Sequence, residues 1–245
     1  GNDVLKGFSG NDHLYGGEGN DTLYAETEST HTDTASNHLV GGIGSDKLYG
    51  SDGNDNLIAQ TLDERSDDSD NFLFGYEGDD VLLGSAGKDV LEGGIGYDTL
   101  IGGAGEDTLK GGNGDDYLVG ATSDIYSNKQ AYGLGGYGAA VWNDFEDDNV
   151  KDILDGGEGW DEYIVGRGDV IKDSDGKGRI YYEGEDGKLQ QLDKLLGFSF
   201  EHFRRDTSGG TAFYRKVVSP ISESEDYSFK VEYVAGNLIV NNGQF

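Results

Sequence analysis

The chain has 245 residues, of which 48 are acidic and 18 are basic, so its formal net charge is −30. This charge disfavours nucleic acid as a partner and opposes direct adsorption to an anionic membrane. Self-repulsion at this charge opposes compaction and only 34% of the residues are hydrophobic, so we expect the repeat region to lack the apolar core needed to fold unaided. The chain has no cysteine. We find no apolar run suited to a secretory signal peptide or an integral membrane segment.

A nine-residue repeat, Gly-Gly-x-Gly-x-Asp-x-Leu-x, recurs along the chain. Ten copies begin at Gly7, Gly16, Gly41, Gly50, Gly75, Gly84, Gly93, Gly102, Gly111 and Gly156, and a partial copy occupies residues 1–6. The glycines allow left-handed and closely approaching backbone, so a short turn can point its carbonyl groups inward. Position eight is Leu in nine copies and Tyr163 in the last, which predicts a very short strand with one inward apolar residue.

Position six is aspartate in all ten copies, and carboxylate oxygens beside backbone carbonyls suit calcium rather than a soft metal. We therefore predict about ten calcium ions in the turns. The candidate metal-binding residues are Asp3, Asp12, Asp21, Asp46, Asp55, Asp80, Asp89, Asp98, Asp107, Asp116, Asp152 and Asp161, with the turn glycines Gly75, Gly84, Gly93, Gly102, Gly111 and Gly156. A flexible acidic linker is the alternative, but disorder does not require Leu at a fixed offset from Asp.

The repeat resembles the calcium-binding nonapeptide of the RTX (repeats-in-toxin) family, also called the haemolysin-type repeat. The resemblance implies an all-β fold, a parallel β-roll in which two turns make one coil and successive strands lie on opposite sheets. It also implies that each calcium sits between turns n and n + 2. The implied aspartate pairs are Asp80 with Asp98, Asp89 with Asp107, and Asp98 with Asp116.

The resemblance further implies a secreted, extracellular bacterial protein that leaves through a type I secretion apparatus. We expect a monomeric calcium-binding module of a toxin or other exoprotein, unfolded in the cytosol and folded by calcium outside the cell. The chain opens inside a repeat and closes without a recognisable signal, as expected for a fragment of a longer protein.

No catalytic motif stands out, so we expect no enzyme. Two alternatives stay open. The first is an adhesin module that presents a glycan- or protein-binding surface to a host cell. The second is the folding tail of a secreted lipase or protease.

We assign residues 1–164 to the roll and residues 165–245 to a mainly β C-terminal cap. Enlarged turns interrupt the repeat at 25–40, 59–74 and 120–155. Counting turns places the second and third of these at one edge of the roll and the first at the other edge. Asn37 and Asn71 replace the consensus aspartate, which leaves open whether their sites have the full ligand set.

The first two enlarged turns are polar and acidic, which favours solvated loops or extra calcium contacts. His31 and His38 lie near Glu26 and Glu28, but no ligand spacing supports a zinc site. The third turn carries aromatic residues that favour either a small satellite core or a contact surface. These residues are Tyr126, Tyr132, Tyr137, Trp142 and Phe145.

The cap is expected to cover the open end of the roll. Leucine spacing permits a short helix within 188–203, and strands are predicted at 211–218, 227–234 and 237–240. Residues 235–237 are predicted as a hairpin turn.

Overall fold

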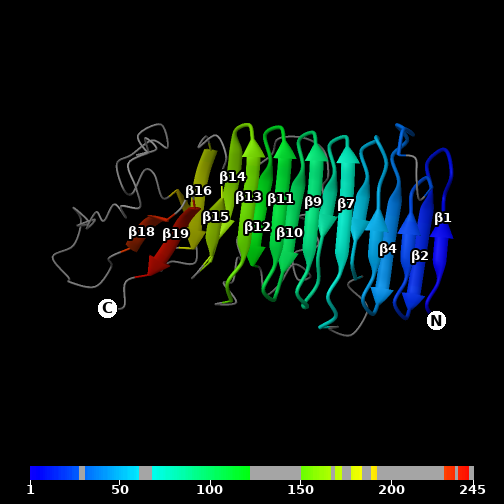
Figure 1. Ribbon diagram of the computed structural model, residues 1–245, viewed down its shortest axis with the longest axis horizontal. Coiled ribbons are helices and arrows are strands. Elements are labelled where there is room, and N and C mark those ends of the chain that lie inside the picture. The colour runs from blue at the N-terminus through cyan, green and yellow to red at the C-terminus, as the bar shows by residue number, and fades with distance from the viewer. Residues whose placement is uncertain are drawn as a thin grey trace.

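The structure is a computed structural model in which the strands stack side by side along one long axis (Figure 1). It describes residues 1–27, 31–60, 68–121, 150–166, 169–172, 178–183, 189–191, 229–234 and 237–242. These residues form β-strands and no helix. Within them, therefore, no helix has the length and hydropathy to span a membrane.

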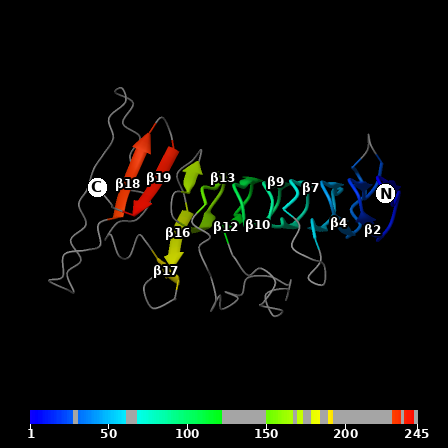
Figure 2. The ribbon, with the colours of Figure 1, turned by 90° about the horizontal axis from the view of Figure 1, so that it is seen from below.

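From β1 to β16 the strands alternate between two sheets, with odd-numbered strands along one side of the roll and even-numbered strands along the other (Figure 2). The ten-stranded sheet has the order β1 (Val4–Lys6), β3 (Thr22–Tyr24), β5 (Lys47–Tyr49), β7 (Phe72–Glu77), β9 (Val90–Ile95), β11 (Thr108–Asn113), β13 (Ile153–Glu158), β15 (Val170–Lys172), β19 (Asn237–Asn242), β18 (Phe229–Val234). The nine-stranded sheet has the order β17 (Leu189–Gln191), β16 (Gly178–Glu183), β14 (Asp161–Val165), β12 (Tyr117–Ala121), β10 (Thr99–Gly103), β8 (Val81–Leu83), β6 (Asn56–Ile58), β4 (His38–Ile43), β2 (His13–Glu18).

Pairing from β1 to β16 is parallel in both sheets, which confirms the predicted parallel β-roll. The register repeats the sequence period, because each residue pairs with the residue at the same position two copies further on. Leu91 pairs with Leu109 in one sheet, and Leu100 pairs with Leu118 in the other. One coil is therefore two nonapeptide turns.

The core is a file of position-eight side chains that point between the two sheets. Side chains alternate across a strand, so position eight faces inward while positions seven and nine face outward. The inward leucines from Leu23 to Leu154 have no exposed surface, and Tyr163 takes the same place in β14. Each coil contributes only two such residues, so a single coil cannot bury an apolar core and the roll depends on stacking.

The outer faces of the two sheets differ. Position nine on the ten-stranded sheet forms an aromatic ladder, in which Tyr24 stacks on Tyr49 at 4.9 Å and Tyr49 stacks on Phe74 at 5.2 Å. Position nine on the nine-stranded sheet forms a buried aliphatic row. This row consists of Leu83, Ile101, Val119 and Ile164. Both rows add apolar contact along the stacking direction, outside the leucine file.

The topology places the three enlarged turns as the turn count predicts. The first connects β3 to β4 and so leads from the ten-stranded sheet to the nine-stranded sheet. The second connects β6 to β7, and the third connects β12 to β13. Both therefore lead from the nine-stranded sheet to the ten-stranded sheet. Because the strands within each sheet are parallel here, connections of one direction share an edge. The aromatic residues predicted in the third turn, from Tyr126 to Phe145, lie outside the described residues.

Beyond residue 164 the roll continues before the pairing changes. β15 and β16 still pair in parallel with β13 and β14, and β17, β18 and β19 then pair antiparallel. β18 and β19 pair with Val234 opposite Asn237, and residues 235–236 of the predicted hairpin turn lie outside the described residues. Leu189–Gln191, at the start of the segment predicted as a helix, forms β17 because its backbone pairs with β16. Residues 192–203 and the predicted strand 211–218 lie outside the described residues.

Candidate calcium sites

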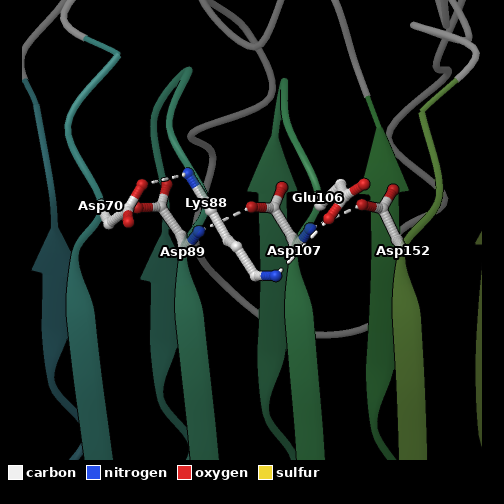
Figure 3. A network of polar contacts seen from close by, with 6 residues as sticks. All are labelled: Asp70, Lys88, Asp89, Glu106, Asp107 and Asp152. Atoms are coloured by element: carbon white, nitrogen blue, oxygen red, sulfur yellow. Dashed lines mark hydrogen bonds and ion pairs between the residues drawn. The ribbon is translucent and has the colours of Figure 1, made fainter.

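The position-six aspartates form hydrogen-bonded ladders that run along the two edges of the roll. In each step, a backbone N–H donates to the Oδ1 atom of the residue at position six one coil further on. Asp80 donates to Asp98 and Asp98 donates to Asp116, both at 2.9 Å. On the other edge, Asp89 donates to Asp107 at 2.8 Å, and Asp107 donates to Asp152 (Figure 3). The structure thus brings together each aspartate pair that the resemblance implies.

The ladders include every candidate aspartate. One contains Asp3, Asp21, Asp46, Asn71, Asp89, Asp107, Asp152 and Asp169. The other contains Asp12, Asn37, Asp55, Asp80, Asp98, Asp116 and Asp161. Asp3 is exposed at the N-terminal end of the roll, and the ladder aspartates from Asp21 onward are at most 2% exposed. A row of buried carboxylates is costly unless something compensates their charge.

The second carboxylate oxygen shows where that compensation is needed. Oδ2 is buried and has no hydrogen-bond partner in five of the ladder aspartates. These are Asp12, Asp21, Asp80, Asp98 and Asp116. Leaving a buried charged acceptor unsatisfied costs more than the roughly 1–3 kcal/mol of a neutral group. A cation bound beside these oxygens would remove that cost.

The first glycine of each repeat leaves the space in which such a cation would fit. A Cβ atom on Gly75 would meet Asp80 Oδ2 and would lie 2.7 Å from the carbonyl oxygen of Gly93. A Cβ atom on Gly102 would likewise meet Asp107 Oδ2 and lie 2.7 Å from the carbonyl oxygen of Gly120. A carboxylate oxygen and a carbonyl oxygen from the next coil therefore converge on one small space.

The other candidate glycines repeat this arrangement with small differences. The Cβ position of Gly84 faces Asp89 Oδ2 and the carbonyl oxygen of Gly102. The remaining candidates face the Oδ2 atom of their own turn's aspartate. These are Gly93, Gly111 and Gly156. The oxygen-only donor set fits calcium.

The donor set does not suit zinc. Within the described residues, no three His, Cys, Asp or Glu side chains gather into a metal-binding group. His31 stacks on Tyr76 at 3.8 Å, and His38 lies against His13. Burial, with a smaller effect of the His13 charge, lowers the pKa of His38. Glu28 lies outside the described residues. In the candidate calcium sites, carbonyl oxygens supply what additional side chains would otherwise provide.

Burial makes these carboxylates hold protons strongly when no cation is bound. Burial, together with the neighbouring carboxylates of Asp98 and Asp55, raises the pKa of Asp80 to about 9. Burial likewise raises the pKa of Asp116 to about 8 and that of Asp98 to about 7. In each case a backbone N–H to the carboxylate offsets only part of the effect.

We expect acidification to stabilise the calcium-free roll. Because the folded-state pKa values lie above the ordinary value of 3.8, the folded roll keeps protons that the unfolded chain has released. Stability is therefore greatest below pH 4 and falls toward pH 7–9, by about 1.4 kcal/mol per pH unit for each group that differs in protonation. Far-UV circular dichroism in chelator should show more β-structure at pH 5 than at pH 8. Less β-structure at pH 5 would contradict this linkage.

Two residues that complete the ladder ends were not predicted from the sequence. Asp169 accepts the backbone N–H of Asp152 at 3.0 Å and is fully buried. The Tyr163 hydroxyl lies 3.4 Å from Asp161 Oδ2 and at the Cβ position of Gly156. Asp169 lies in the sequence Gly-x-Gly-Asp-Val-Ile, which ends in Ile171 and was the available signal for this residue. However, Asp169 follows Asp152 by 17 residues, which breaks the period of the repeat. For Tyr163, the only signal in the sequence was that it replaces leucine at position eight of the repeat.

Comparison with protein-family models agrees with this geometry. The model of the RTX calcium-binding nonapeptide repeat matches residues 1–26, 31–60, 66–100, 96–124 and 151–171. These stretches cover more than half of the chain, so the chain belongs to the RTX calcium-binding nonapeptide repeat family. It is a calcium-binding β-roll module. Neither the curated proteins nor the solved structures contain a match to the chain.

Proposed function

We propose that the chain is the calcium-driven folding module of a secreted bacterial RTX exoprotein such as a toxin. In this proposal it is unfolded in the cytosol, leaves through a type I secretion apparatus, and folds as a monomer when it meets extracellular calcium. The observation that carries the proposal is the row of buried Oδ2 atoms without hydrogen-bond partners, at Asp12, Asp21, Asp80, Asp98 and Asp116. Such a row makes the folded roll unfavourable at neutral pH unless a cation is bound.

The contribution of calcium binding to stability supports a folding switch between the cytosol and the extracellular space. A site with a dissociation constant of about 0.1 mM contributes about 1.4 kcal/mol at about 1 mM calcium. At the far lower calcium concentration of a cytosol the same site contributes almost nothing. Summed over the stacked turns, the calcium term reaches the 5–15 kcal/mol that typifies the stability of a whole domain.

The module is proposed to act without catalysis. The buried aspartates are committed to the ladders, in which each Oδ1 atom already accepts a backbone N–H. A carboxylate held in this way is suited to binding a cation between coils rather than to proton transfer with a substrate. Any enzymatic or adhesive activity would then need residues outside the ladders.

We expect protease resistance of the roll to depend on calcium at extracellular concentrations. At about 0.1 μM free calcium a calcium-independent protease should cleave throughout the roll, whereas at about 1 mM calcium the roll should resist cleavage. Lys88 and Lys110 lie in successive coils and provide cleavage positions inside the roll that mass spectrometry can locate. Magnesium at the same concentration is the control. Equal resistance of these positions at both calcium concentrations would contradict a folding switch.

A further inference from the structure

Two turns of the roll depart from the consensus in the same way. The turns 50–55 and 84–89 carry a serine at position two, where most repeats have glycine. Each serine faces an asparagine at position six of a preceding enlarged turn. Ser51 faces Asn37 and Ser85 faces Asn71, at the same sequence separation of 14 residues.

In the first of these turns, hydrogen bonds join Asn37, Ser51 and Asp55 directly. Asn37 Nδ2 lies 3.0 Å from Asp55 Oδ1, 3.0 Å from Ser51 Oγ and 3.0 Å from the carbonyl oxygen of Ala35. The backbone N–H of Ser51 donates to Asp55 Oδ2 at 2.6 Å, and its hydroxyl donates to the same atom at 3.2 Å. Both oxygens of the Asp55 carboxylate are therefore hydrogen-bonded.

The second turn repeats the arrangement on the other edge of the roll. Asn71 Nδ2 lies 3.0 Å from Asp89 Oδ1, 3.0 Å from Ser85 Oγ and 2.9 Å from the carbonyl oxygen of Ser69. The Ser85 hydroxyl donates to Asp89 Oδ2 at 3.1 Å. We call each Asn, Ser and Asp set an amide latch: Asn37 with Ser51 and Asp55, and Asn71 with Ser85 and Asp89.

The orientation of the asparagine amide follows from its partners. Asn37 Oδ1 accepts the backbone N–H of Asp12 at 2.9 Å, and Asn71 Oδ1 accepts the backbone N–H of Asp46 at 2.9 Å. A backbone N–H can only donate, so the oxygen must lie on that side and the NH₂ group on the side of the next coil. The amide latch thus places a donor where a consensus aspartate has its second carboxylate oxygen.

The backbone of these two turns also differs from that of the consensus turns. Position two has a positive φ in consensus turns, for example 127° at Gly94 and 112° at Gly103. Neither Ser51 nor Ser85 has a positive φ. With this backbone, the serine N–H faces the Oδ2 atom of its own turn's aspartate.

We propose that the pairs Asn37 with Asp55 and Asn71 with Asp89 bind no calcium, and that the amide latch takes its place. This inference rests on the proposed calcium-driven folding of the other turns, and it names the two coil junctions that do not take part. Each latch follows one of the first two enlarged turns, so the coils that carry these insertions close with hydrogen bonds alone. Each latch pair also carries one negative charge where a consensus pair carries two.

The third enlarged turn provides an internal contrast. Asp152 takes the place of the asparagine, and Gly166, again 14 residues later, takes the place of the serine. The Gly166 N–H donates to Asp169 Oδ2 at 2.7 Å, but Asp152 has no amide NH₂ and Gly166 has no hydroxyl to form the latch. A Cβ atom on Gly120 would lie 2.7 Å from Asp152 Oδ2 and 2.9 Å from Asp169 Oδ2. This junction keeps the charge that a cation would neutralise.

The test counts calcium bound to the whole 245-residue chain by equilibrium dialysis at a saturating concentration of about 10 mM. The double variant Asn37→Asp with Ser51→Gly restores the consensus at both altered positions. It should bind one more calcium per chain than the unaltered chain. Combining it with Asn71→Asp and Ser85→Gly should add a second.

Two further variants keep the test decisive. Asn54→Asp adds the same charge at position five, where Asp79 and Asp115 occur naturally, and it should add no calcium. Asn37→Ala removes the latch without adding a ligand, and it should leave the calcium count unchanged. An unchanged count in the restored variants, or one ion fewer in Asn37→Ala, would overturn the latch proposal. An unaltered chain that binds no calcium would instead overturn the proposed function itself.

Discussion

Replacing Asp98 with alanine is expected to raise the calcium concentration at the folding midpoint severalfold. Asp98 lies in two consecutive pairs, because its Oδ1 accepts the Asp80 N–H at 2.9 Å and its backbone N–H donates to Asp116. Two weakened sites remove about 3 kcal/mol at about 1 mM calcium. The Asp80 N–H left without an acceptor adds about 1 kcal/mol or more. A calcium titration followed by far-UV circular dichroism measures the shift.

The matched control is Asp33→Ala in the first enlarged turn. Asp33 is only half-buried and accepts the N–H groups of Gly10 at 2.7 Å and Ala35 at 3.1 Å. It belongs to neither ladder, so its replacement should change stability by about 1 kcal/mol at most. Equal midpoint shifts for the two variants would show that the aspartates do not act in pairs across coils.

Replacing Gly102 with alanine is expected to eliminate one calcium site and to destabilise the roll. The new Cβ would meet Asp107 Oδ2 and would lie 2.7 Å from the Gly120 carbonyl oxygen, closer than real Cβ contacts occur. It would occupy the space in which the two oxygens converge. We expect a loss of about 3–5 kcal/mol, from overpacking together with the lost site. Equilibrium dialysis should find one calcium fewer, and the folding midpoint should rise.

Gly17→Ala separates this effect from backbone strain. Gly17 has a φ of 99°, but a Cβ there would meet no atom within 4 Å. Its replacement therefore introduces the left-handed strain of about 1–2 kcal/mol without filling a site. It should leave the calcium count unchanged. A loss of one ion in Gly17→Ala, or none in Gly102→Ala, would place the calcium sites elsewhere.

The repeating part of the fold could be predicted from the sequence because a single period specifies it. Leu at position eight and Asp at position six recur together, so one nine-residue unit determines the leucine file, the aspartate ladders and the pairing of Asp98 with Asp116. The placement of the enlarged turns followed from counting the same unit. Because every copy specifies the same local structure, the fold of a repeat can be predicted from a single sequence.

The departures from the period could not be predicted in the same way. The role of Ser51 depends on an asparagine 14 residues away and on the sign of one φ angle, neither of which the repeat specifies. Asp169 joins the ladder at 17 residues instead of the 18 that separate uninterrupted coils. Leu189 begins β17 because β16 offers a free edge, and this tertiary pairing overrides a leucine spacing that permits a helix.

The most direct test of the central claim is a calcium titration of the 245-residue chain followed by far-UV circular dichroism, from chelator to about 10 mM, with magnesium as the control. The buried ladder carboxylates predict a cooperative transition from coil to β-structure that calcium produces and magnesium does not. Full β-structure already present in chelator at neutral pH would contradict the claim. Calcium would then bind to a roll that folds without it.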